Sequence, residues 1–357
     1  MTTLESAPAV ALGDATLGRP RPTALVGFLA IAAIFAVLPL LPFGVPVVFS
    51  GAFDTPGTLQ VLASALVLGG LAMSYDVIYG HTGMLSFGHA LPFALGIYGT
   101  NLAMIHWELS YPLAALLAIV GTVIVSLVLG SVALRATGTA FAMVTLAFAE
   151  AFHLLVLIDP PRIFGREEGL TLASSQLPDW LRGVVNTRNV YWLALAAVLV
   201  VFVVARRVTR SRAGRVFAAI RENEPRVELL GLRPFPYKLS SYVLASGLAA
   251  LCGAVQLVVV RGANISSTSA TFSISIVVMV VLGGSGRLWS AALGGFVYGI
   301  LTLRLSSVAT SDAIEALPKA IGGPLSQPLF VLGTLFVVLV MFAPAGIGSL
   351  FRARRRG

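Results

Sequence analysis

Long apolar runs dominate the chain and constrain its fold more than any other feature. Each is long enough to cross roughly 30 Å of hydrocarbon as a helix, once Gly and Pro interruptions are allowed. With 57% hydrophobic residues, 11% charged residues and a mean hydropathy of +0.92, the chain carries far fewer charges than the roughly 25% of soluble domains. The sequence therefore predicts an all-α, polytopic membrane protein with about ten transmembrane helices, near residues 24–41, 59–79, 83–105, 112–134, 139–158, 190–205, 237–260, 272–286, 290–304 and 328–345.

The distribution of basic residues predicts how the chain is threaded. With a cytoplasmic N-terminus, 17 of the 24 Lys and Arg residues lie on the cytoplasmic side and 7 outside, and both termini are then cytoplasmic. Residues 1–22 form a disordered cytoplasmic tail, 23–349 the transmembrane domain and 350–357 a basic cytoplasmic tail. Spans 272–286 and 290–304 are short, so we expect them to be tilted, or broken where they border a cavity.

The segment 206–236 is a charged island with eight of the 24 Lys and Arg residues. It predicts two short cytoplasmic helices: Ser211 or a neighbour caps the first, Pro225 breaks it or begins the second, and Gly231 ends the second. The first helix has an apolar side with Val216, Phe217 and Ile220. Its solvated side has the charged residues Arg215, Arg221, Glu222 and Glu224. So short a helix is marginal in water, so we expect a partner surface to order it. The alternative is a linker held at the lipid surface by its arginines.

Residues 80–99 depart from the pattern of an ordinary spanning helix. They contain five glycines and Pro92, which favour unwinding or close approach of the backbone. Thr82, Ser86 and His89 supply polar groups at membrane depth, and an unwound helix can bind a polar or zwitterionic solute through its exposed backbone groups. The alternative is packing of helices through the glycines, with His89 hydrogen-bonded to a neighbour.

Acidic residues are rare inside the apolar runs. Glu150 and His153 lie three residues apart, and so on one helical face, near the middle of span 139–158. Charge inside the membrane suggests function, here a proton relay, but a buried pair anchoring a neighbouring helix fits the pattern better. Asp76 lies near the cytoplasmic end of its span, where we expect it to reach the interface and to have a structural role.

Several other classes of protein are excluded by missing features. The chain has only two lysines, Lys238 and Lys319, and neither follows glycine, so it lacks a P-loop for ATP. Its four histidines have no HExxH spacing, and a single cysteine, Cys252, allows no intrachain disulfide. The net charge of +9 comes from arginines that border apolar runs, which indicates a membrane rather than nucleic acid. The outside segment 159–189 is either a folded cap, with a short helix at Pro178 to Leu181, or a plain connecting loop.

Five stretches, taken in order, resemble one family. They are YDVIYGHTGMLSFGHALPFALGIYG (75–99), ATGTAFAMVTLAFAEAF (136–152), SRAGRVFAAIRENEPRVELLG (211–231), VVLGGSGRLWSAALG (280–294) and FAPAGIGSLF (342–351). The chain is identified as a LivM-like permease subunit of the bacterial ABC importers for branched-chain amino acids. It departs from the family pattern at FGREEGL (164–170), at Ser290-Ala291 and at Pro225. Related subunits of importers for urea and short amides have similar motifs, so these solutes are the alternative.

The resemblance implies a multi-pass protein of the bacterial plasma (inner) membrane, without an ATPase site, a catalytic residue, a cofactor or a metal. Its partners would be a second permease subunit in a heterodimer, two ATP-binding subunits, an extracytoplasmic solute-binding protein and membrane lipid, with no nucleic acid. Loop 206–236 would dock in the ATPase cleft through Arg215, Val216, Phe217, Ile220, Arg221, Glu222, Glu224 and Gly231. From the residues themselves, we expect the translocation pathway beside Thr82, Ser86, Gly88, His89 and Glu150. The rival functions are a proton-coupled secondary transporter that uses Glu150 and His153, and a membrane scaffold.

Overall fold

The computed structural model of the chain describes residues 33, 35–40, 54–160 and 162–309 and scattered positions between 327 and 347. The two predicted tails, 1–22 and 350–357, lie outside the described residues, as does most of the first and last predicted spans.

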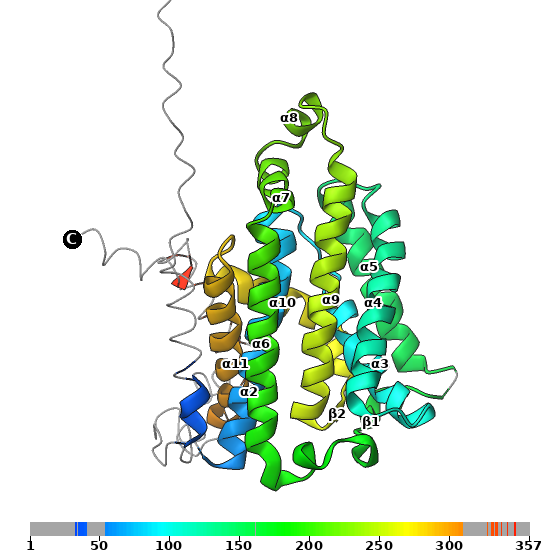
Figure 1. Cartoon of the computed structure of the whole chain (residues 1–357), viewed down its shortest axis with the longest axis vertical. Helices are drawn as coiled ribbons and strands as arrows, with labels where there is room; N and C mark the ends of the chain where they lie inside the picture. Colours follow the sequence, from blue (N-terminus) through cyan, green and yellow to red (C-terminus); the bar gives the residue numbers. More distant parts are fainter. Residues whose placement is uncertain are drawn as a thin grey trace, which may run out of the picture.

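The described chain is almost entirely helical (Figure 1). Its longer helices are α2 (Pro56–Asp76), α3 (Ala90–His106), α4 (Tyr111–Ala133), α5 (Thr139–Ile158), α6 (Thr187–Thr209), α9 (Pro234–Val260), α10 (Ala270–Gly283) and α11 (Leu288–Ala309). Two short helices, α7 (Arg212–Glu222) and α8 (Glu224–Leu229), connect α6 to α9. A π-helical turn, η2 (Val77–His81), continues α2, and single 3₁₀ turns are η1 (Leu38–Leu40), η3 (Arg166–Glu168), η4 (Ser174–Gln176), η5 (Asp179–Leu181), η6 (Val184–Asn186) and η7 (Ile265–Thr268).

Five helical stretches in the described residues are long and apolar enough to cross a membrane. They are Pro56–His81, Tyr111–Ala133, Thr139–Ile158, Val184–Thr209 and Pro234–Val260. Proline lies in the first turn of α2, α4 and α9, where a missing N–H costs no helical hydrogen bond. The class predicted from the apolar runs, a helical polytopic membrane protein, is therefore confirmed.

Helix α2 is the centre of the bundle. It is buried along almost its whole length and packs against α6, α9, α10 and α11, whereas α4 and α5 leave most of their length exposed. Backbones come very close where α2 meets α11: a Cβ added to Gly295 would lie 2.4 Å from the carbonyl oxygen of Leu68. Small residues at such crossings are how apolar helices associate in lipid, where hydrophobic burial gives little help.

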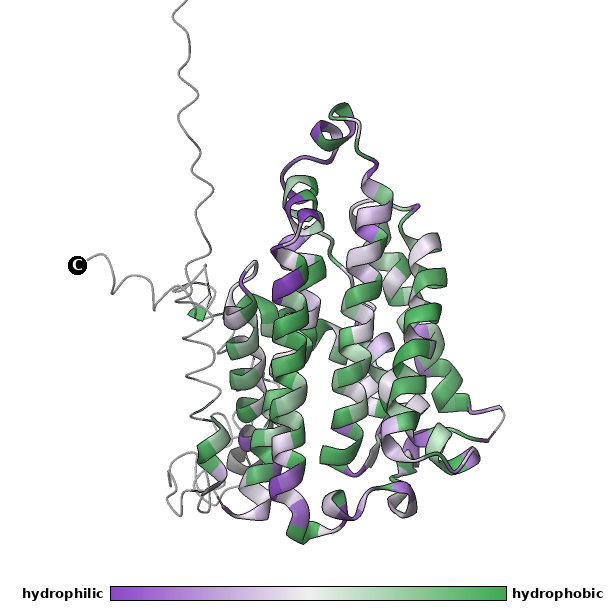
Figure 2. Cartoon of the chain, viewed as in Figure 1, coloured by the Kyte–Doolittle hydropathy of each residue, from purple (hydrophilic) through white to green (hydrophobic). Residues whose placement is uncertain are grey.

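The two ends of the bundle differ (Figure 1). Helices α7 and α8 project from one end, and the opposite end carries a two-stranded antiparallel ribbon, β1 (Leu170–Thr171) paired with β2 (Gly262–Ala263), in which Leu170 faces Ala263. Figure 2 shows hydrophobic residues along the middle of the helices and hydrophilic ones gathered towards α7, α8 and the ribbon end. This banding is what a bilayer imposes on a bundle.

Segment 159–186 is folded rather than a plain loop. It contains four 3₁₀ turns and β1, and one of the turns, Asp179–Leu181, lies where the sequence predicted a short helix. Asn101 of α3 holds it in place: its Nδ2 donates to the carbonyl oxygen of Thr171 at 3.0 Å, and its Oδ1 accepts from the N–H of Ala173 at 3.2 Å. The segment therefore closes the ribbon end of the bundle.

One predicted span was wrong at its start. Residues 83–105 were expected to form a single helix, but α3 begins only at Ala90, and residues 82–89 run without regular helix between η2 and α3. The glycines at positions 83 and 88 explain this: Gly83 takes a positive φ of 79°, a conformation that a helix does not contain. The predicted spans 272–286 and 290–304 correspond to α10 and α11.

Candidate functional site

The interrupted segment 82–89 is anchored by side chains of α2. The hydroxyl of Tyr75 donates to the carbonyl oxygen of Ser86 at 2.9 Å and accepts from its N–H at 3.3 Å. Nε2 of His89 lies 2.9 Å from Oγ of Ser74, and the His89 ring meets Tyr75 edge-on. Oγ1 of Thr82 donates back to the carbonyl oxygen of Val77 at 3.0 Å. Polar groups of this segment thus obtain hydrogen bonds from α2 and η2, as apolar surroundings require.

The other side of this segment packs against α5 and α10. The N–H of Phe87 donates to Oγ1 of Thr145 at 3.2 Å, and that of Ala90 donates to Oγ of Ser273 at 3.2 Å. A Cβ on Gly88 would lie 2.3 Å from the carbonyl oxygen of Thr145, so only glycine fits. Four of the predicted pathway residues, Thr82, Ser86, Gly88 and His89, are therefore brought together but are buried in packing contacts.

Glu150 and His153 connect α5 to the start of α10. Oε1 of Glu150 accepts from the N–H of Ala270, the first residue of α10, at 2.9 Å. Nδ1 of His153 lies 2.6 Å from Oγ1 of Thr268 in the preceding turn. The prediction that the two share a helical face is confirmed, and the geometry is that of the anchoring alternative.

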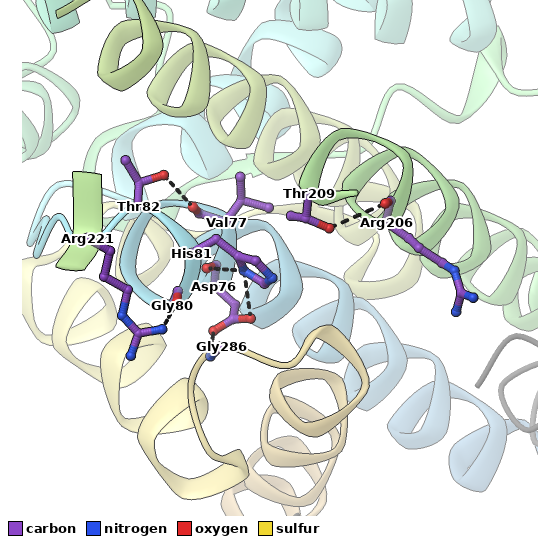
Figure 3. A network of polar contacts seen from close by, with 9 residues as sticks. All are labelled: Asp76, Val77, Gly80, His81, Thr82, Arg206, Thr209, Arg221 and Gly286. Carbon is purple, nitrogen blue, oxygen red and sulfur yellow. Dashed lines mark hydrogen bonds and ion pairs between the residues drawn. The ribbon is translucent and has the colours of Figure 1, made fainter. Parts of the chain in front are cut away.

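A polar cluster lies where η2 meets α7 and the loop between α10 and α11 (Figure 3). Asp76 is fully buried, so the prediction that it reaches the interface was wrong. Its Oδ1 accepts from the N–H of Gly286 at 2.7 Å, and its Oδ2 lies 3.5 Å from Nδ1 of His81. Arg221 of α7 donates to the carbonyl oxygen of Gly80. Three segments far apart in the sequence thus meet at this cluster.

Helices α7 and α8 form where the sequence predicted them. Oγ of Ser211 accepts from the N–H of Gly214 at 3.3 Å, Pro225 lies in the first turn of α8, and Gly231 follows the helix with a φ of 80°. Asn223 caps α8, its Oδ1 accepting from the N–H of Arg226 at 2.9 Å. This cap was missed, although asparagine directly before a Glu-Pro pair is a recognised signal. Nζ of Lys238 also lies 2.8 Å from the carboxylate of Glu224.

The apolar side of α7 faces its own chain. Phe217 and Ile220 are only 1% and 5% exposed, Val216 is half-buried, and α7 packs on α6, α9 and η2. The prediction that these side chains need a partner's groove to order the helix was therefore wrong, because the groove is within the molecule. The exposed apolar residues lie instead beyond α7, where Leu229 and Leu230 are 89% and 73% exposed.

These features define a multi-pass membrane protein with a structured connection between two of its spans and a broken helix in its interior. The chain belongs to the family described as branched-chain amino acid transport system / permease component, whose sequence model matches residues 57–343. The LivM-like resemblance is thereby confirmed.

Curated relatives cover most of the chain. It is 26% identical over 323 residues to the high-affinity branched-chain amino acid transport system permease protein LivM of Escherichia coli, a match that spans 83% of this chain and 71% of the relative. It is also 26% identical over 309 residues to BraD of Pseudomonas aeruginosa, which has the same description, over 81% of this chain and 95% of the relative. A probable permease of this kind in Methanocaldococcus jannaschii is 26% identical over 310 residues, over 81% of this chain and 83% of the relative. No solved structure matches the chain significantly.

Proposed function

We propose that the chain is the membrane-spanning permease subunit of an ABC importer for branched-chain or related small amino acids, driven by ATP hydrolysis on separate subunits. The observation that carries this function is the family match over residues 57–343. The names of the relatives support branched-chain amino acids, rather than urea and short amides, as the proposed solutes.

The proposed complex contains this chain, a second permease subunit, two ATP-binding subunits and an extracytoplasmic solute-binding protein, in the bacterial inner membrane. The end with α7 and α8 is cytoplasmic in this proposal, because residues 206–236 hold a third of the basic residues of the chain. Segment 159–186 then lies outside, where a solute-binding protein docks.

The ATPase contact is proposed at α8 and the turn after it. Large apolar side chains exposed on a polar loop mark a protein-binding surface, and Leu229 and Leu230 are such side chains. The same connection contains exposed Arg215 and Glu222 on α7 and Gly231 after α8. Glu224 forms an ion pair with Lys238 of α9. An ATPase docked there would move α7 as a whole, because Phe217, Ile220 and Val216 fix this helix to the membrane domain. ATP hydrolysis would be coupled to transport through that movement.

The solute route is proposed to run beside segment 82–89 and Glu150. Non-helical backbone at membrane depth is tolerated where it is packed in protein or borders a cavity, and this segment has eight consecutive residues without regular helix. Ser86, Gly88 and His89 are packed closely, so opening of the route requires their contacts with α2 and α5 to rearrange.

The rival function, a secondary transporter with a proton relay, is tested by Glu150→Gln. An amide oxygen can still accept the hydrogen bond from Ala270 N–H, but the side chain no longer carries a proton to exchange. We expect uptake to be retained within about threefold, since a neutral acceptor replaces a charged one in a single bond. Loss of uptake driven by a pH gradient would favour the relay.

The proposed function itself is tested by uptake of labelled leucine into proteoliposomes. Vesicles with the complete complex and ATP inside should accumulate leucine when binding protein is present, and vesicles with this chain alone should not. Competition with isoleucine, valine, urea and acetamide ranks the solutes. Uptake by the chain alone, driven by a pH gradient and indifferent to ATP, would refute the assignment.

A further inference from the structure

Arg221, in the last turn of α7, lies among three glycines of the membrane domain. Its guanidinium donates to the carbonyl oxygen of Gly80 in η2 (Figure 3). A Cβ on Gly83 would lie 2.9 Å from its Cγ, and one on Gly286 would lie 3.0 Å from its Nη1. The side chain therefore runs directly over backbone at each of these positions.

The residues that Arg221 contacts belong to the two places where helices inside the bundle are interrupted. Gly80 and Gly83 lie at the change from α2 through η2 into segment 82–89. Gly286 lies in the loop between α10 and α11, and α10, with 14 residues, is about 21 Å long and thus shorter than the roughly 30 Å of hydrocarbon. Interrupted helices are where a small force changes the direction of a span, because the regular hydrogen-bond ladder is absent.

Asp76 fixes these two interruptions to each other. Its Oδ1 accepts from the N–H of Gly286 at 2.7 Å, and a Cβ on Gly80 would lie 1.9 Å from the same oxygen and 2.4 Å from the nitrogen of Gly286. The carboxylate is fully buried, so this bond is shielded from water. Asp76, Gly80 and Gly286 are therefore packed directly together, and Arg221 connects them to α7.

We propose that Arg221 is the joint through which movement of α7 reaches the translocation pathway, and that it acts on η2 and the α10–α11 loop rather than on the ATPase surface. This inference rests on the proposed function. Arg221 is a positioning residue, because its contacts are with the backbone of η2 and of the α10–α11 loop. Displacement of α7 pulls on the carbonyl of Gly80, and the Asp76 bond carries the displacement to the start of α11.

The first test is the number of solute molecules imported per ATP hydrolysed by the reconstituted complex. Arg221→Met keeps an unbranched side chain without the guanidinium donors, and should lower this ratio about tenfold, the factor for losing one charge-assisted hydrogen bond. Assembly with the ATPases and basal hydrolysis should be unchanged, and Arg221→Lys should restore part of the ratio. Arg210→Met, at another exposed arginine of the same connection, is the matched control and should leave the ratio unchanged.

The contrary results separate failure of the Arg221 joint from failure of the proposed function. An unchanged ratio in Arg221→Met, an equal loss in Arg210→Met, or failure of Arg221→Met to bind the ATPases would overturn the joint. If the unaltered complex shows no ATP-dependent uptake, the proposed function fails as well.

The second test follows the movement itself. Ser285 is exposed in the α10–α11 loop, and the native Cys252 is buried, so Ser285→Cys gives a reporter with little background labelling. ATP should change the rate of thiol labelling at position 285 in the otherwise unaltered complex, and this change should disappear when Arg221→Met is added. The same nucleotide-dependent change in both complexes, or none in the first, would show that α7 does not act on this loop.

Discussion

At the scale of single residues, Asp159 shows how a charged side chain organises a turn at the ribbon end. It ends α5 with a φ of 47°, and its carboxylate accepts from the N–H groups of Ile163, Phe164 and Gly165 at 2.8, 3.1 and 3.0 Å. Burial of the carboxyl opposes its ionisation, but these three donors and Arg166 outweigh burial and hold the pKa of Asp159 below its usual value. The turn is therefore stabilised by the ionised form.

This lowered pKa predicts acid lability of the turn. The stabilisation is fully present above the unfolded pKa of about 3.9 and is lost as the pH falls through the lower folded value. Hydrogen exchange of the three amides, corrected for intrinsic rates, should therefore accelerate only below about pH 4. Asp159→Asn should exchange faster at neutral pH and lack this dependence. If it retained the same acid step, another group would be responsible.

Gly88 gives a second prediction at this scale, for stability. A methyl group at this position would meet the backbone of Thr145, which cannot turn aside as a side chain can, so Gly88→Ala should cost about 1 to 3 kcal/mol. The measurement is the Tm of the purified protein in detergent. Gly121→Ala in α4 is the matched control, because a Cβ there meets nothing within 4 Å and should leave the Tm unchanged or raise it. Equal Tm values for the two variants would contradict the tight contact.

At the scale of elements, the connection α7–α8 separates residues that hold a helix in place from residues free to bind a partner. Phe217→Ala empties a buried site and should destabilise the chain by about 3 to 5 kcal/mol. Leu230→Ala should leave the Tm unchanged and weaken ATPase binding by about 1 kcal/mol or more. Thermal unfolding of the chain and co-purification of the ATPases distinguish the two. A stable Phe217→Ala variant that loses only the ATPases would restore the partner-groove interpretation.

How well the sequence predicted these elements depended on how far apart in the chain the interacting residues lie. Ser211, Pro225 and Gly231 act on backbone within a few residues, so local rules placed both ends of the α7–α8 connection correctly. The surface that buries Phe217 comes from other elements of the bundle, and nothing in the sequence around position 217 encodes it. An amphipathic pattern shows that a helix has an apolar side, but not whether that side faces its own chain or another.

For segment 82–89 and Glu150, too, local features could be predicted from the sequence and distant contacts could not. The glycines and polar residues of 80–99 correctly indicated an interrupted helix. The partners of Phe87 and Glu150 could not be predicted, because Thr145 and Ala270 lie 58 and 120 residues away in the sequence. Residue types alone therefore favoured function and packing about equally for residues 80–99 and favoured anchoring for Glu150 and His153, and the contacts identify the partners.

At the scale of the whole molecule, the two ends of the bundle predict its orientation in the membrane. Val185, at the ribbon end, is 96% exposed, and Thr137 is exposed at the end that carries α8. In intact cells, a membrane-impermeant thiol reagent should label Val185→Cys, and it should label Thr137→Cys only after permeabilisation. The reverse pattern would place the arginine-rich connection outside and refute the cytoplasmic assignment.

The joint at Arg221 also bears on how such chains diverge. Its acceptor is a main-chain carbonyl and its close neighbours include glycines, so the hydrogen bond itself does not depend on a particular side chain of the membrane domain. Homologous chains can therefore form this hydrogen bond wherever the backbone conformation around Gly80 is the same and the residue equivalent to Arg221 is an arginine. The Arg221 contact should then survive exchange of the α7–α8 connection between distant members of the family, and the apolar side of α7, with Phe217 and Ile220, becomes the part that must match the foreign membrane domain.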